Sequence, residues 1–111
     1  MSAVDIVQKQ LDAYNAQDLD AFCACFAADG VIADLNGAVT QTGIDEIRER
    51  YAAMFALHPE NQARVVHRMA VGDVVIDHEQ VSRTPEQSFE ALAIYTVKNG
   101  RIARVDFVRA Q

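Results

Sequence analysis

Apolar side chains in the first half of the chain recur at the spacing of amphipathic helices. Ser2 and Asp5 form a capping-box pattern, which predicts a helix from about residue 3 to residue 15. Asp18 is suited to cap a second, shorter helix, and Asp29-Gly30 is expected to end it. The apolar positions of these two helices are Val4, Val7, Leu11 and Tyr14, followed by Leu19, Phe22 and Phe26.

A short strand and a third helix are predicted next. Residues 31–35 are apolar enough for a brief strand, which Asn36-Gly37 would end. Thr42 with Asp45 forms another capping box, and His58-Pro59 is a typical helix end. The apolar stripe of this third helix is Ile44, Ile47, Tyr51 and Phe55.

From Gln62 onward the apolar period changes to two, which indicates strands. Gly72-Asp73 and Asn99-Gly100 are tight-turn pairs, so each is expected to join two strands into a hairpin. The order of elements predicts an α+β fold in which helices cover one face of a curved, mainly antiparallel sheet. The four predicted strands are residues 63–71, 74–82, 89–98 and 101–109.

Alternation assigns the side chains of the first hairpin to two faces. The face that contains His67 and His78 has more apolar residues, so we expect the helices to cover it. Arg68, Asp77 and Glu79 share the opposite face, where an exposed ion pair across the hairpin is expected. In the third strand Leu92 and Ile94 make the outward face half apolar, which favours a partner subunit there. Its other face holds Phe89, Ala91, Ala93, Tyr95 and Val97.

Composition and charge narrow the classes of function. The 111 residues are half apolar with a net charge of −6, which predicts one globular domain over residues 1–111. Neither half of the chain is strongly basic, so we expect neither nucleic acid nor an anionic membrane as a partner. No transmembrane run or secretion signal is found in the sequence, and a cytoplasmic location is expected. Cys23 and Cys25 are predicted to be free thiols.

Three segments of the sequence are similar to a known protein superfamily: YNAQDLDAFCACFAADGVIADLNG, TGIDEIRERYAAMF and AIYTVKNGRIARVDF. Together they resemble the NTF2-like superfamily, in particular its ketosteroid-isomerase and SnoaL-like branch. The resemblance implies a cone-shaped α+β barrel of three N-terminal helices on a curved sheet. It also implies a pocket between the helices and the concave sheet face, and a homodimer through the convex face.

The resemblance further implies where a steroid delta-isomerase-like site would lie. Asp34 in VIADLNG occupies the position of the isomerase's general base, and His78 falls on a cavity-facing position. The two positions that donate hydrogen bonds to the developing oxyanion, a feature of ketosteroid isomerase, are Gln10 and Ala93 here. Because both donors have changed, weak or no turnover of a 3-oxo-Δ5-steroid is expected.

Each candidate also has a structural interpretation. Asp34 suits a turn as well as a base, and Gln10 suits a buried, backbone-bonded amide as well as a pocket donor. Opposed His67 and His78 are more typical of packing than of a metal site, and no metal or cofactor motif is present. A hydrolase site using Arg68 and Asp106 resembles the epoxide-hydrolase branch only loosely.

Two functional hypotheses follow. The first is an isomerase or lyase that removes a proton next to a carbonyl of a small apolar molecule, with Asp34 as base and Gln10 or His78 as polar partner. The second is a non-catalytic module that binds a small ligand. In both, inward-pointing residues converge on one pocket, which is expected to include Tyr14, Tyr51, Phe55, Ala93, Tyr95 and Phe107.

Overall fold

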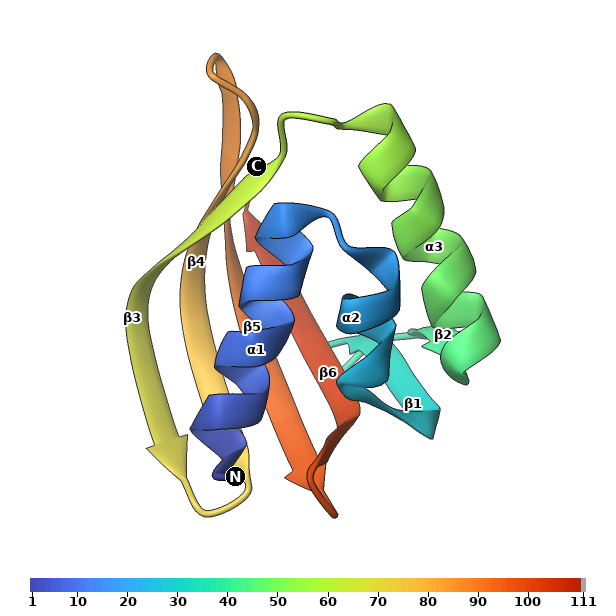
Figure 1. Cartoon of the computed structure of the whole chain (residues 1–111). Coiled ribbons are helices and arrows are strands. Elements are labelled where there is room, and N and C mark those ends of the chain that lie inside the picture. The colour runs from blue at the N-terminus through green and yellow to red at the C-terminus, as the bar shows by residue number, and fades with distance from the viewer. Residues whose placement is uncertain (111) are drawn as a thin grey trace.

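Helices cover one face of a six-stranded, curved sheet in the computed structural model, which describes residues 1–110 (Figure 1). The strand order is β2-β1-β6-β5-β4-β3, and all neighbours are antiparallel except β1 and β6. The predicted α+β architecture is therefore confirmed. The elements are α1 (Ala3–Ala16), α2 (Leu19–Ala24), β1 (Phe26–Asp34), β2 (Val39–Thr42), α3 (Ile44–Leu57), β3 (Gln62–Val71), β4 (Val74–Thr84), β5 (Gln87–Lys98) and β6 (Arg101–Ala110).

The predicted cap of α1 forms, whereas that of α3 does not. The Ser2 hydroxyl accepts from the Asp5 backbone N–H, and the Asp5 carboxylate accepts from the Ser2 backbone N–H. At α3 the N-cap is Gly43, with φ of 87°, a conformation that suits glycine. The Glu46 carboxylate accepts instead from the backbone N–H of Thr42, at 2.9 Å. The capping-box prediction was therefore one residue out of register.

The end of α2 also differs from the prediction. The helix stops at Ala24, and Phe26 already belongs to β1, where it pairs with Ile102 of β6. The Ile102 N–H donates to the Cys25 carbonyl at 2.8 Å. This long-range pairing to the C-terminal strand ends the helix, and a local pattern does not reveal it. The short strand β2 was missed for a similar reason, since it exists only as a partner of β1.

Both predicted hairpin turns are present. Val71 pairs with Val74 around Gly72-Asp73, and Lys98 pairs with Arg101 around Asn99-Gly100. Asn99 and Gly100 both have positive φ, 52° and 75°, as a type I′ turn requires.

The two faces of the first hairpin are the reverse of the prediction. On β4 the buried side chains are Val75, Asp77, Glu79 and Val81, so this face is the helix-covered one. His78 lies opposite His67, as predicted, with ring centroids 5.8 Å apart, but on the outer face. A β-bulge between Val65 and His67 changes which β3 residues point inward, because one extra residue inverts the alternation.

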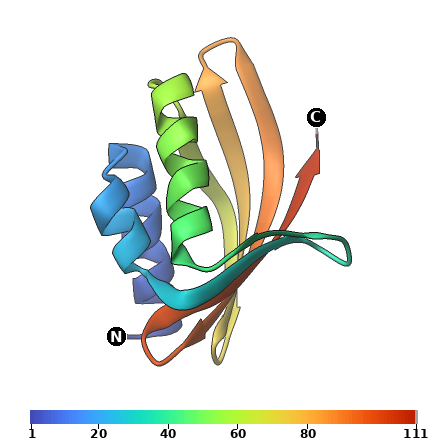
Figure 2. The same cartoon turned by 90° about the vertical axis from the view of Figure 1, so that its right-hand side faces the viewer.

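The core fills the space between the helices and the concave sheet face. An aromatic cluster of Tyr14, Phe22, Phe26, Tyr51 and Phe55 ties the three helices together, with the Phe22 and Tyr51 centroids 4.4 Å apart. Figure 2 shows that the helices all lie on one side of the sheet and leave the other face uncovered. Within residues 1–110, no helix is long and apolar enough to span a membrane.

Candidate functional site

A pocket of about 100 Å³ lies between α1, α3 and the concave face of strands β3 to β6. Its wall combines aromatic rings with charged and amide groups, which is the usual composition of a ligand site. The lining residues are Gln10, Leu11, Tyr14, Arg50, Tyr51, Met54, Ala63, Glu79, Val81, Arg83, Phe89, Ala91, Tyr95, Phe107 and Arg109.

The structure brings many of the sequence-predicted residues to this pocket. Gln10 and three tyrosines line it together with Phe107. Phe55 and Ala93 are buried in the core but do not contribute to the lining. The three tyrosines are Tyr14, Tyr51 and Tyr95.

Asp34 and His78, the two predicted proton-transfer groups, lie outside the pocket lining. Asp34 is the last residue of β1, and 55% of its side chain is exposed. Its carboxylate lies 4.0 Å from the guanidinium of Arg109. His78 points from the outer face of β4, where its Nε2 lies 2.9 Å from the Glu90 carboxylate. The cavity-facing orientation expected for His78 is therefore wrong, because the hairpin presents its other face to the helices.

Glu79 is the acidic group that the pocket does contain. Its side chain projects from β4 between the helices and the sheet, and only 6% of the residue is exposed. Burial, reinforced by the nearby negative charge of Asp77, raises its pKa to about 7. Arg68 opposes that rise only in part. A carboxyl group with this pKa exchanges protons readily near neutral pH.

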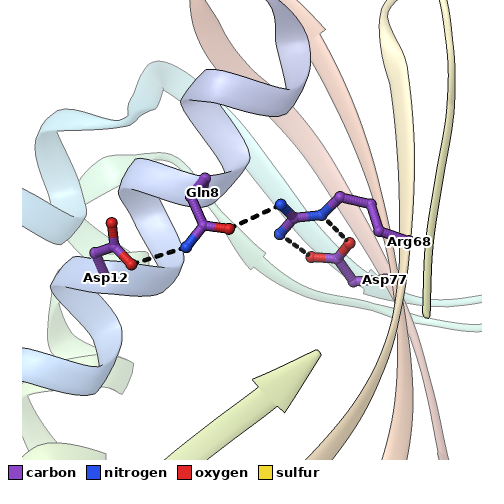
Figure 3. Close-up of polar contacts among 4 residues, drawn as sticks. All are labelled: Gln8, Asp12, Arg68 and Asp77. Carbon is purple, nitrogen blue, oxygen red and sulfur yellow. Dashed lines mark hydrogen bonds and ion pairs between the residues drawn. The ribbon is translucent and has the colours of Figure 1, made fainter. Parts of the chain in front are cut away.

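Arg68 has limited influence on Glu79 because it is engaged with Asp77 (Figure 3). Its Nε and Nη2 donate to the two oxygens of Asp77 at 2.6 and 2.9 Å, a bidentate pair. Its Nη1 donates to the amide oxygen of Gln8 on α1, and the Gln8 amide donates to Asp12. The Asp77 side chain is fully buried. The predicted ion pair therefore exists, but inside the fold, where it joins the sheet to α1.

A second polar chain positions Tyr14 at the pocket. The amide N–H of Asn61, a fully buried residue, donates to the Tyr14 hydroxyl oxygen at 2.6 Å. Arg83 donates to the Asn61 side-chain oxygen at 2.8 Å. Because the hydroxyl oxygen accepts from Asn61, its own O–H stays available as a donor. Burial raises the pKa of Tyr14, so the phenol keeps that proton at neutral pH.

Glu79 and three arginines are the charged pocket residues that the sequence analysis did not select. Glu79 was assigned to the outer face because apolar residues were counted without the bulge of β3. A usable signal was present: Ala91, Ala93, Tyr95 and Val97 form one apolar face of β5, and the register places Asp77 and Glu79 opposite two of them. The arginines left no local signal, because they come from distant segments, as Arg50, Arg83 and Arg109.

The two cysteines do not belong to the pocket lining. Cys23 and Cys25 are free and buried, and burial raises the pKa of both thiols. Thiols of this kind are poor nucleophiles. Among residues 1–110, no group of three or more His, Cys, Asp or Glu side chains is arranged to hold a metal ion.

Comparison with known proteins places this architecture among described folds. A family model described as a SnoaL-like domain matches residues 7–105. A crystal structure of an uncharacterized cystatin fold protein from Novosphingobium aromaticivorans is 31% identical, with a TM-score of 0.93, and the match covers 98% of this chain and 99% of that one. No curated protein matches the chain.

Two further solved structures are similar. A "putative polyketide cyclase" from Sinorhizobium meliloti is 28% identical with a TM-score of 0.81, and the match covers 97% of this chain and all of that one. A protein with a ketosteroid isomerase-like fold from Catenulispora acidiphila is 20% identical with a TM-score of 0.77, and the match covers 93% of this chain and 83% of that one. At 20% identity, the similarity to the protein from Catenulispora acidiphila shows a shared fold alone.

Proposed function

The chain belongs to the SnoaL-like domain family, and from this premise we propose that its pocket binds a small organic molecule and moves a proton next to a carbonyl group. The proposed base is Glu79. The supporting observation is a buried carboxyl group in an aromatic pocket whose pKa of about 7 lets it both accept and return a proton near neutrality. Returning the proton to another carbon gives an isomerase, and loss of a leaving group gives a lyase.

The pocket also supplies donors for the charge that this step creates. When Glu79 takes the proton, the electron pair of the C–H bond moves toward the carbonyl group. The product is an enolate, which carries negative charge on the former carbonyl oxygen. The Tyr14 O–H, held in place by Asn61, is the proposed donor to that oxygen. The amide of Gln10, which is 5% exposed and lines the same pocket, is a second donor.

The pocket size favours a molecule smaller than a steroid. Sites for drug-sized ligands usually measure about 300–1,000 Å³, whereas this pocket measures about 100 Å³. The similar structure from Sinorhizobium meliloti is described as a "putative polyketide cyclase". An aldol-type ring closure starts with the same removal of a proton beside a carbonyl, so Glu79 would suit that chemistry equally.

Exchange of ketone protons with solvent tests the proposal without knowledge of the natural substrate. We expect the protein to accelerate deuterium incorporation into 2-indanone in D₂O, followed by NMR. Glu79→Gln should lower the protein-dependent rate by about 10²–10⁴-fold, the usual contribution of a general base. The wild-type rate should rise as the pH increases through about 7, because the carboxylate is the active form.

The variant Asp34→Asn separates the two assignments of the base. If Asp34→Asn abolishes exchange while Glu79→Gln retains it, the base is Asp34, as the family resemblance implies. Glu86→Gln, at an exposed position between β4 and β5, is the charge-matched control. If no exchange occurs although 2-indanone binds, the chain is a non-catalytic ligand-binding module, which is the alternative function.

We also propose that the chain forms a homodimer through the outer face of the sheet. The helices leave this face uncovered (Figure 2), and it exposes large apolar side chains. Such a patch on an isolated subunit favours association. Its exposed apolar residues include Met69, Leu92 and Val108.

Light scattering after size-exclusion chromatography tests the dimer. The wild type is expected to have twice the mass of one chain at micromolar concentration. The double variant Leu92→Glu/Val108→Glu, which pairs two adjacent residues of β5 and β6, should be monomeric. Leu57→Glu, at an exposed position on α3, is the matched control and should stay dimeric. A monomeric wild type would contradict the proposal.

A further inference from the structure

Three guanidinium groups converge on the pocket from separate elements. Arg50 comes from α3, Arg83 from β4 and Arg109 from β6, and all three line the same cavity. The chain has a net charge of −6 and ten basic residues, and three of these ten line one small pocket. With Glu79 as the one acidic residue of the lining in the described part of the chain, the arginines leave the pocket with an excess of positive charge, which attracts a ligand of the opposite sign.

The pocket arginines differ from the other paired arginines in their partners. Arg48, Arg68 and Arg104 each lie within 3.0 Å of a carboxylate. Arg50 and Arg83 instead bond to neutral groups: Arg50 donates to the Gln41 side-chain oxygen and Arg83 to that of Asn61. These bonds hold the two groups in place, and neither guanidinium forms an ion pair with a carboxylate of residues 1–110.

Arg109 is the least constrained of the three. Its guanidinium lies over the Phe107 ring, 4.6 Å from the centroid, and Arg50 lies 5.8 Å from the same centroid. Its ion-pair partner within residues 1–110 is Asp34, at a distance of 4.0 Å. Partial burial and then the positive charge of Arg50 lower the pKa of Arg109. The fold thus holds like charges together at a partly exposed rim, an arrangement that a bound anion would relieve.

The inner end of the pocket has a complementary, uncharged polar group. The side-chain oxygen of Gln10 is buried and has no hydrogen-bond partner among the described residues. An unpaired buried acceptor destabilises the folded protein, and Gln10 lines the pocket. A ligand that presents a hydroxyl or N–H group at this end would satisfy it.

We propose that the natural ligand is a small organic acid whose carboxylate binds Arg50, Arg83 and Arg109 while its apolar body fills the aromatic pocket. This inference rests on the proposed function, because it names the substrate class of the same site. A planar carboxylate matches the paired N–H groups of a guanidinium. The rings of Phe89 and Phe107, beside Arg83 and Arg109, favour an acid with an apolar or aromatic body over a free inorganic anion.

Titration calorimetry with phenylacetate and phenylacetamide tests the assignment, because the two probes have nearly the same shape and differ in charge. We expect the wild type to bind phenylacetate at least about 10-fold more tightly than the amide. Arg109→Gln should weaken phenylacetate binding by about 10- to 100-fold, as loss of one charge-assisted hydrogen bond does. Affinity for the amide should not change.

Arg101→Gln is the matched control, since it removes one positive charge from an exposed site far from the pocket lining. It should leave phenylacetate binding within about twofold. Equal affinities of acid and amide, a loss in Arg101→Gln as large as in Arg109→Gln, or preference for phenyl phosphate over phenylacetate would overturn the inference.

Glu79→Gln separates this inference from the proposed reaction. Glu79→Gln keeps all three arginines that are proposed to bind the carboxylate. The variant should therefore retain the preference for the acid even though it loses proton exchange. If the acid binds and exchange fails in the wild type, the carboxylate site stands and the reaction does not. If exchange of 2-indanone occurs but acid and amide bind equally, the reaction stands and the carboxylate site is wrong.

Discussion

Arg68→Met is expected to lower the free energy of unfolding by about 3–5 kcal/mol, the largest stability effect that the structure implies. Asp77 is fully buried, and both of its oxygens accept from Arg68. Without the guanidinium, the carboxylate stays in the core without a partner and beside Glu79. The melting temperature should fall by roughly 10–20 °C for a domain of this size, as calorimetry or circular dichroism would measure.

A double variant distinguishes the loss of a charge partner from the loss of packing. In Arg68→Met/Asp77→Leu the uncompensated carboxylate is gone, so much of the stability should return. Arg104→Met is the control at an exposed ion pair with Asp106 and should leave the melting temperature nearly unchanged. If Arg68→Met melts within a degree or two of Arg104→Met, the buried pair does not stabilise the fold.

The fold could be predicted because its signals are local. A capping box fixes the start of α1, and the Asn99-Gly100 pair fixes a hairpin by its backbone conformation. The features that were missed depend on contacts between distant segments. The end of α2 is set by pairing of β1 with β6, and β2 exists only as an edge strand beside β1.

The site was predictable only in part, because its position depends on which sheet face is covered. Tyr14 was expected in the pocket from helical spacing and Gln10 from the family resemblance, and both line the pocket, while their roles remain proposals. Glu79 was assigned outward because its face of the hairpin contains more charged residues. Two of those charged residues, Arg68 and Asp77, form an ion pair with each other on the helix-covered face of the sheet. Counting apolar residues fails where a buried polar network belongs to the core.

That network leaves Glu79 as the buried charge with the poorest compensation, which predicts an unusual dependence of stability on pH. Its pKa is about 7 in the fold, against an ordinary value of 4.5. Between these values the folded protein binds more protons than the unfolded chain, so stability should fall as the pH rises from about 4.5 to 7. Each pKa unit corresponds to about 1.4 kcal/mol, so the free energy of unfolding above pH 7 should be about 3 kcal/mol lower than it is below pH 4.5.

Glu79→Gln should remove this loss, because the amide does not ionise. We expect the melting temperatures of variant and wild type to be similar near pH 4.5 and to diverge as the pH rises, with the variant higher by roughly 10 °C at pH 8. Glu86→Gln, at an exposed position, should follow the wild type at every pH. Parallel curves for Glu79→Gln and wild type would show that the Glu79 carboxylate is not destabilised by burial. A variant that is more stable yet inactive in proton exchange would show that the same buried charge costs stability and supplies the base.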